Sequence, residues 1–451
     1  MSPKGARTTL VVLSLAASAS ATAATLTIEE TSLQARVAYQ HASARAQSIS
    51  TLSTLEGGFT VRWRESLSLR ASAWVESDAS GRLRPRDFDE RRFDHASNLN
   101  RAIDLGSHAN LELRDLYLQW QGERTQVRLG KQQVVWGKLD GLRVLDQVHP
   151  ADFHRFLLLD DARRRLPQWG VHSTHYLPRW SFEALALVDN TVHDIADPGG
   201  WFAFRAPRLR YGFSGDSVTE SVGVRSDLPD PWSDLTLGAR ASRQVGVHEI
   251  AFVAKRGHDF EGIGELRAAP ADAATASSLL LVRQFPRQDL LGASWESSLG
   301  RVVMRAELAF QPQRRFNVRD TQQQDLSTTR ANQWLVGLAL DADLPFGILA
   351  STQLLLDRVV SASPGLVRPQ EDWIATLSLR RKLRYDALQV QLRYLGDLRV
   401  GDGMIDLGLR YAINDRIALA LRHAQFHGDA TGLFGQFADR DLVELRVEAS
   451  L

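Results

Sequence analysis

The feature that most constrains this chain is the alternation of apolar and polar residues in paired runs around short polar turns. Between residues 111 and 136, the apolar positions of two such runs are Leu116, Leu118, Trp120, Val127, Leu129, Val135 and Trp136. The polar turn 121–124 separates the two runs. Period-two patterning on both sides of a short polar turn predicts an antiparallel hairpin, because alternate side chains of a strand lie on opposite faces.

The two ends of this hairpin differ. One connection is the short turn 121–124, whereas beyond the second run a charged, proline-containing segment extends from 137 to 169. Downstream hairpins repeat the asymmetry, with tight turns at 297–300, 341–347 and 414–416. The pattern predicts an all-β fold: a transmembrane antiparallel β-barrel with short periplasmic turns and long extracellular loops.

Counting the alternating stretches predicts about 18 strands, within a range of roughly 16 to 20. The first is 33–39, and stretches in the middle of the chain are 203–213, 217–226, 234–243 and 247–256. Residues 257–286 are interpreted as a long loop, with the alternative that 277–285 forms a strand. The last strand, 442–451, is apolar at every odd position from Val443 to Leu451.

The N-terminus has the features of an export signal. Lys4 and Arg7 precede a short apolar core at 10–19, and small residues follow at 19–24. This order predicts a secretory signal peptide, residues 1–23, followed by a single barrel domain, residues 24–451. The alternative, an uncleaved membrane anchor, requires a longer apolar run than the sequence contains.

Composition excludes several classes of function. The chain has 54 basic and 53 acidic residues, so it lacks the basic excess expected of a nucleic-acid partner. It has no cysteine, which excludes disulfides and thiolate metal sites. The sequence contains no Gly-x-Ser-x-Gly elbow, His-Glu-x-x-His helix or phosphate-binding glycine loop. We therefore expect a protein that is not an enzyme and has no cofactor and no metal.

Aromatic residues begin or end many of the apolar runs. They are Trp120, Trp136, Trp295, Trp334, Trp373 and Tyr411. Amphipathic rings prefer the boundary between headgroups and hydrocarbon, so these residues are candidates for the two aromatic girdles of a membrane barrel. The alternative is burial in the core of a soluble β-sandwich.

The segment 137–169 is the candidate functional loop. Its charged residues are Lys138, Asp140, Arg143, Asp146, Asp152, Arg155, Asp160, Asp161, Arg163, Arg164 and Arg165. Apolar residues such as Leu145 and Phe156 lie between them. A loop folded into the lumen would pack its apolar side on the barrel wall and direct its charges to the pore, where such charges set selectivity. The alternative is an extracellular lid whose ion pairs hold its own shape.

The hairpin Tyr117-Leu118-Gln119-Trp120, with Arg128-Leu129-Gly130-Lys131-Gln132 and Val135-Trp136-Gly137-Lys138, resembles an element of Gram-negative porin-like barrels. It is similar to that of the alginate-export family and of poorly characterised families related to it. This resemblance implies a single-chain barrel in the bacterial outer membrane that carries charged solutes or polysaccharide through an Arg-lined lumen.

The expected function is passive passage of small polar or anionic solutes, or export of a charged polymer, with 137–169 as the constriction. The alternative is a plugged barrel that serves as a scaffold or binding partner for periplasmic or surface proteins. The expected partners are outer-membrane lipid and lipopolysaccharide, the solute, and the barrel-assembly machinery. The last of these follows from residues 442–451, which resemble the C-terminal assembly signal of outer-membrane barrels.

Overall fold

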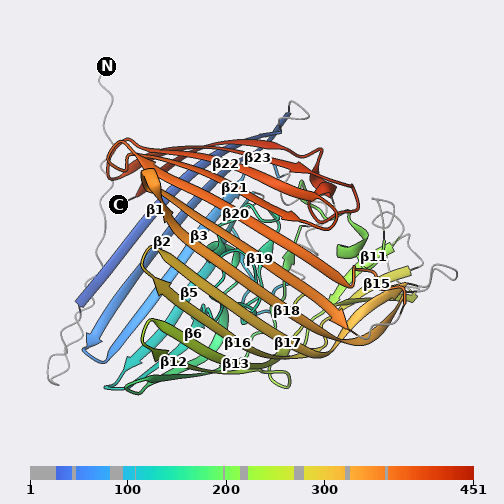
Figure 1. Cartoon of the computed structure of the whole chain (residues 1–451), viewed down its shortest axis with the longest axis horizontal. Coiled ribbons are helices and arrows are strands. Elements are labelled where there is room, and N and C mark those ends of the chain that lie inside the picture. The colour runs from blue at the N-terminus through green and yellow to red at the C-terminus, as the bar shows by residue number, and fades with distance from the viewer. Residues whose placement is uncertain are drawn as a thin grey trace.

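The structure is a computed structural model that describes residues 27–42, 47–81, 95–106, 108–196, 199–213, 222–268, 279–319, 326–360 and 364–450. Within this part of the chain, 18 strands form a closed antiparallel barrel (Figure 1). They are β1 (Thr27–Ala42), β2 (Gln47–Arg64), β3 (Leu67–Asp78), β5 (Ala109–Gln121), β6 (Thr125–Gln132), β8 (Gln168–Tyr176), β9 (Trp180–Leu187), β12 (Thr236–Val245), β13 (His248–His258), β16 (Arg287–Leu299), β17 (Val302–Arg319), β18 (Leu326–Leu344), β19 (Ile348–Val360), β20 (Glu371–Leu383), β21 (Leu388–Asp397), β22 (Asp402–Ala412), β23 (Ile417–His427) and β24 (Leu442–Ser450). The predicted signal peptide, 1–23, lies outside the described residues.

The barrel closes between its first and last strands. β1 pairs with β24 from Gln34 opposite Ser450 to Ala42 opposite Leu442, and every other barrel strand pairs with its neighbours in chain order. Closure gives every wall strand a neighbour on both sides, which a structure surrounded by lipid requires. The predicted fold class and strand number are therefore confirmed.

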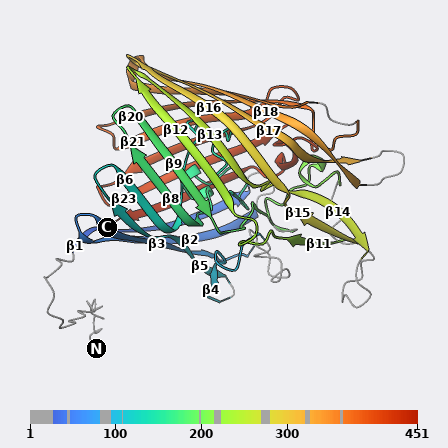
Figure 2. The same cartoon turned by 90° about the horizontal axis from the view of Figure 1, so that it is seen from below.

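The connections differ between the two ends, as the sequence predicts. We call the end with tight connections, such as 65–66 and 300–301, the turn end. The opposite loop end carries the long connections 133–167, 188–235 and 259–286. The C-terminus lies at the turn end, and β11, β14 and β15 lie at the loop end (Figure 2).

The outer surface of the barrel is apolar and the inner surface is polar. On β24, Leu445 and Val447 face outward and are 53% and 45% exposed. Glu444, the residue before Leu445, faces the lumen and is only 7% exposed. This inside-out alternation matches a wall that meets lipid outside and a polar lumen inside. No helix among the described residues is long and apolar enough to cross a membrane.

Two of the expected strands are not part of the barrel. Residues 203–213 hold only a short 3-10 helix, η2 (Pro207–Leu209), so the predicted strand there is wrong. Of 217–226, residues 217–221 lie outside the described part, and β11 (Val222–Asp227) joins a separate sheet. These segments alternate in sequence, but they lie in a long connection where no neighbouring wall strand is available for pairing.

The separate sheet has the order β11-β15-β14, with β14 at Ile263–Ala268 and β15 at Leu279–Gln284. The alternative of a strand at 277–285 is thus correct for β15, although this strand does not enter the barrel. A second small element is the parallel pair β7 (Asp152–Phe153) and β10 (Asp194–Ile195). The remaining short elements are β4 (Ile103–Asp104), α1 (Asp161–Arg164), η3 (Pro345–Gly347) and η4 (Gly435–Phe437).

One aromatic residue is not where the girdle prediction places it. β6 ends at Gln132, and Trp136 beyond it is only 1% exposed, inside the barrel. Trp120 and Trp334, in contrast, are 46% and 39% exposed on outward positions. Trp136 is buried because the chain leaves the wall after β6 and enters the lumen, so its apolar ring packs on the inner surface.

Candidate functional site

The loop 137–169 folds into the barrel and packs against the inner wall. Buried loop residues form one apolar cluster with inward-facing residues of β9, β13, β16, β17 and β18. The members are Val134, Trp136, Leu139, Val144, Leu145, Val148, Leu185, Leu187, Val253, Leu290, Ala309, Leu335 and Ala339. The apolar residues of the loop thus cover the lumen side of the wall, as the first of the two loop interpretations expects.

Three glycines of the wall make room for this packing. A Cβ atom at Gly337 on β18 would lie 2.2 Å from the Leu139 side chain, and one at Gly292 on β16 would lie 2.2 Å from that of Leu145. At Gly238 on β12, it would lie 2.5 Å from the ring of Trp136. Any larger residue would overlap the loop, because real Cβ contacts do not approach so closely.

A buried carboxylate on β17 fixes the backbone of the loop. Glu307, 2% exposed, accepts hydrogen bonds from the backbone N–H of Lys138 and, at 3.0 Å, from that of Leu145. These groups have no partner in a regular ladder, so a charged acceptor from the wall satisfies them. In sequence, Glu307 looks like any polar residue on the lumen face, so the prediction missed its role.

Two histidines also hold the loop, the buried His149 and the half-buried His193. His149 Nε2 accepts the N–H of Val134 at 2.7 Å, and His193 Nδ1 accepts the N–H of Ala151 at 2.8 Å. Burial lowers the pKa of His149 to about 3 and keeps the pKa of His193 well below its usual value. Both rings are therefore neutral at pH 7, and one nitrogen of each ring can accept a hydrogen bond.

Most charged residues that the sequence predicts for the site form ion pairs. The partners are Glu249 for Lys138 at 3.0 Å, Arg305 for Asp140 at 3.7 Å, Arg165 for Asp146 at 2.7 Å, Glu76 for Arg155, Glu56 for Arg163 at 2.5 Å, and Asp161 for Arg164. Arg163, Arg164 and Arg165 thus reach three different partners and do not form one cationic cluster.

Two of the three remaining predicted residues, Asp152 and Asp160, have local roles. The carboxylate of Asp152 contacts the ring of His154. The carbonyl of Asp160 accepts the N–H groups of Arg163 and Arg164, at 3.0 and 2.9 Å, where α1 begins. Of all the predicted site residues, the structure brings only Arg143 and Arg164 to the lining of the cavity described next.

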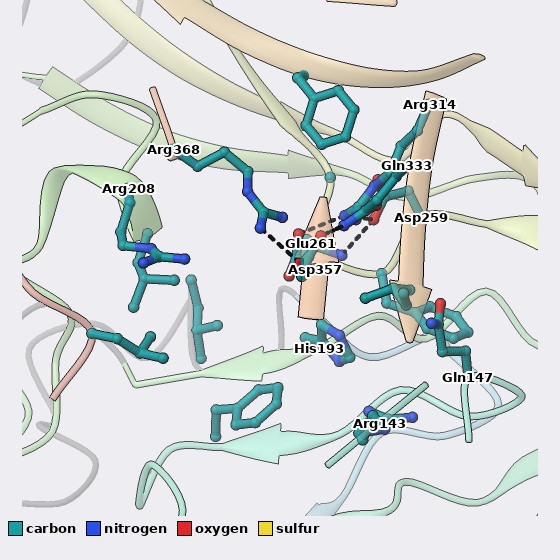
Figure 3. Close-up of a pocket in the computed structure, with 18 of the residues that line it drawn as sticks. Arg143, Gln147, His193, Arg208, Asp259, Glu261, Arg314, Gln333, Asp357 and Arg368 are labelled. Carbon is teal, nitrogen blue, oxygen red and sulfur yellow. Dashed lines mark hydrogen bonds and ion pairs between the residues drawn. The ribbon is translucent and has the colours of Figure 1, made fainter. Parts of the chain in front are cut away.

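A cavity of about 400 Å³ lies between the loop 137–169, the loop-end connections and the wall (Figure 3). Its lining contains eight cationic residues, Arg143, Arg164, Arg208, Lys255, Arg283, Arg314, Arg315 and Arg368. Three carboxylates, Asp259, Glu261 and Asp357, are also in the lining. The excess of positive charge gives the cavity an attraction for anions.

Two of these arginines are held in a network that Figure 3 shows. Arg314 donates hydrogen bonds to Asp259 from Nε and Nη2, at 2.7 and 3.0 Å. Its Nη2 also donates to Glu261 at 2.5 Å. Arg368 binds Asp357 at 2.7 Å. The Arg314 charge lowers the pKa of Glu261 to about 2, so this carboxylate is ionised at pH 7.

Arg143 and Lys255 differ from these arginines. In the part of the chain that the structure describes, both form hydrogen bonds only with backbone carbonyls. Arg143 Nε donates to Asp146 O and Lys255 Nζ to Gln147 O, each at 2.7 Å. The Lys255 nitrogen also lies 4.8 Å from the ring centre of Phe260. A carbonyl does not neutralise a cation, so these two side chains retain charge that a bound anion can complement.

The comparisons with known proteins agree with the barrel. No curated protein matches the chain. OccAB3 from Acinetobacter baumannii is similar in fold, with 10% identity, a TM-score of 0.50 and coverage of 93% of this chain and 98% of that one. The structure of OpdK from Pseudomonas aeruginosa with vanillate has 13% identity, a TM-score of 0.48 and coverage of 93% and 98%.

The closed barrel, its apolar outer surface and its polar, loop-filled lumen define a porin-like β-barrel of the bacterial outer membrane. The chain belongs to the family described as "Protein of unknown function (DUF1302)", whose match spans residues 84–451. The predicted resemblance to outer-membrane porin-like barrels is thus confirmed, and the family match is to this family of unknown function rather than to the alginate-export family.

Proposed function

We propose that the protein is a passive outer-membrane channel for small anionic solutes, with the loop 137–169 as its constriction and no catalytic activity. The observation that carries this proposal is the position of Arg143 and Lys255. They bring two cations without a bonded carboxylate into a cavity that the loop itself helps to form. Positive charge at a narrow point favours anions over cations.

The experiment is single-channel conductance in a planar bilayer, with a salt gradient to measure the ratio of anion to cation permeability. Arg143→Gln and Lys255→Gln are expected to lower that ratio about fivefold each, since a unit charge near 4 Å contributes about 1 kcal/mol in watery surroundings. The matched control is Arg256→Gln. Arg256 directly follows Lys255 on β13, and its side chain is 63% exposed. An unchanged ratio in both lumen variants would contradict anion selection at this site.

A deletion of residues 144–159 tests the constriction separately. Removal of the inward part of the loop is expected to increase the conductance step and to weaken selectivity. Export of a charged polymer would use the same path, and polymer added to one side should then block the current in the wild-type protein but not in the deletion variant. Equal conductance before and after deletion would contradict the constriction.

The second candidate, a plugged scaffold, is favoured by a different observation. Aromatic side chains from several loop-end connections pack together inside the barrel. Phe156 lies 4.8 Å from Phe437 and 5.6 Å from Phe434, measured between ring centres, and Phe202 lies 5.8 Å from Phe437. A barrel that stays silent in the bilayer even after the deletion of 144–159 would favour this scaffold.

We also propose that residues 1–23 are removed on export, which leaves the barrel domain 24–451, and that the barrel-assembly machinery recognises the last strand. The support is the sequence pattern of 1–23 and the outward apolar row of β24. The mass of the mature protein from the outer-membrane fraction tests the cleavage. Retention of residues 1–23 in that fraction would contradict it.

A further inference from the structure

A second group of polar side chains lies inside the barrel, apart from the cationic cavity. Asp152, His154 and Asp194 each direct one possible ligand atom to the same place, and these atoms lie within 4.8 Å of one another. All three residues are 3% exposed. The backbone sets this geometry, because β7 and β10 pair in parallel with Asp152 directly opposite Asp194.

Two more residues complete the surroundings. His95 Nδ1 lies 3.2 Å from a carboxylate oxygen of Asp194. On the other side of the group, Glu76 on β3 lies 3.8 Å from His154 Nε2, and Arg155 forms an ion pair with Glu76. His154 therefore has carboxylates near both of its ring nitrogens.

We propose that Asp152, His154 and Asp194 bind one divalent transition-metal ion, with Zn²⁺ as the best fit. One imidazole and two carboxylates are ligand types that Zn²⁺ accepts, at about 2.0–2.2 Å, and a water molecule can take the fourth position. Neighbouring ligand atoms of such a tetrahedral site lie about 3.3 Å apart. The distance from Asp194 Oδ2 to His154 Nδ1, 3.9 Å, is close to that separation. His95 Nδ1 lies 3.2 Å from the other oxygen, Asp194 Oδ1, and so orients this carboxylate from outside the ligand set.

Glu76 fits the role of an outer partner. A histidine that binds a metal through Nδ1 donates its other N–H to a carboxylate, which fixes the ring and strengthens the ligand. His154 Nε2 accepts a hydrogen bond from Arg155 Nε at 3.1 Å, and Arg155 is paired with Glu76. Metal binding through Nδ1 therefore requires a proton on Nε2 and a turn of the Arg155 side chain, after which Glu76 Oε1, 3.8 Å from Nε2, accepts that proton.

The ligands come from two separate connections. Asp152 and His154 lie between β6 and β8, and Asp194 lies between β9 and β12. A bound metal ion joins these connections and ties the loop 137–169 to the connection 188–235. The expected role of the ion is therefore structural, since it restrains the loop at Asp152 and His154, beyond the segment 138–145 that Glu307 holds.

The test is metal binding by the full-length protein, purified in detergent without a polyhistidine tag and first stripped with a chelator. Zn²⁺ is the probe, and its content after dialysis is measured by mass spectrometry. We expect one Zn²⁺ per wild-type chain, not displaced by excess Ca²⁺, and at least tenfold weaker binding in Asp152→Asn and Asp194→Asn. The matched control is His172→Gln, which removes the 3.0 Å pair of His172 with Glu183 and no proposed ligand.

Folding of each variant is checked by its shift in gel mobility on boiling. Zinc-free wild-type protein that takes up no Zn²⁺ would overturn the proposal whatever the variants do. Equal Zn²⁺ content in wild type and in a folded Asp152→Asn variant would overturn the assigned ligands, and displacement by Ca²⁺ would overturn the metal class. A failure of the channel proposal would leave this result unaffected, because metal content is measured without transport.

Discussion

The carboxylate of Glu307 on the barrel wall accepts a hydrogen bond from the backbone N–H of Leu145 at 3.0 Å. It also accepts one from the N–H of Lys138, so a single wall residue holds both ends of the turn 138–145. This contact connects the loop 137–169 to the barrel wall, where β17 is paired on both sides.

Substitution Glu307→Gln is expected to loosen the loop. The amide offers one acceptor oxygen, so one of the two loop N–H groups loses its partner at a cost of about 1–3 kcal/mol. The barrel should still form, but its single-channel current should fluctuate between levels more often. Glu448→Gln on β24 is a control, since the ion-pair partners of Glu448 are Arg410 and Arg446 of wall strands and no residue of the loop. Identical current traces for both variants would contradict the anchoring role.

The wall glycines predict a steric effect. Gly337→Ala places a Cβ where the Leu139 side chain lies, at 2.2 Å, and should displace the loop from the wall. Faster proteolysis within 137–169 is the measurement. Gly408→Ala on β22 is the matched control, because its Cβ would meet only Gln391, at 3.9 Å. If both variants resist protease equally, the loop does not depend on this contact.

Acid should weaken the hold on the loop through His149. Its pKa is about 3 in the folded protein, against an ordinary value of 6.5. Below pH 6.5, His149 takes up a proton when the loop is released or unfolded but not when it is folded. The free energy that favours the folded loop therefore falls as the pH decreases from 6.5 to about 3. The full effect amounts to a few kcal/mol at most.

The measurement is protease sensitivity of the loop between pH 7 and pH 4. His149→Gln keeps an acceptor for the Val134 N–H but does not titrate, so its sensitivity should change less over this range. A variant with the same pH profile as the wild type would show that other groups cause the acid response.

The outward face of β24 predicts the effect of a charge in lipid. Leu445→Arg should destabilise the barrel by about 2–4 kcal/mol if residue 445 lies near the middle of the bilayer. Leu445→Ala, which removes area without adding charge, should cost much less. Urea unfolding in lipid vesicles, followed by tryptophan fluorescence, measures both. Equal losses would contradict a lipid-facing position for Leu445.

The barrel could be predicted from sequence because each wall strand meets lipid on one side and water or polar loops on the other. Leu445 and Glu444 show this directly, as neighbours with opposite surroundings. The inward position of the loop was also predictable, since residues such as Leu145 and Phe156 need an apolar surface to cover. Trp136 was placed wrongly because an aromatic residue after an alternating run looks the same whether the strand continues or ends.

The cavity could not be predicted in the same way. Arg208, Lys255, Arg314 and Arg368 come from four distant parts of the chain, and each looks like an ordinary polar residue of a strand or loop. Their meeting depends on how the loop-end connections fold over one another, for which the sequence has no periodic signal. The pairing of Asp152 with Asp194 has the same origin, since β7 and β10 have only two residues each.

The glycines at 238, 292 and 337 limit which barrels could accept the loop 137–169 as a graft. Because these glycines have no side chain, Trp136, Leu145 and Leu139 pack directly on the wall backbone, so the loop and the wall are complementary in shape. In another barrel that receives the segment 137–169 alone, side chains at the three equivalent positions would overlap the side chains of the segment. Transfer of the loop in its present position therefore requires transfer of these three wall glycines with it.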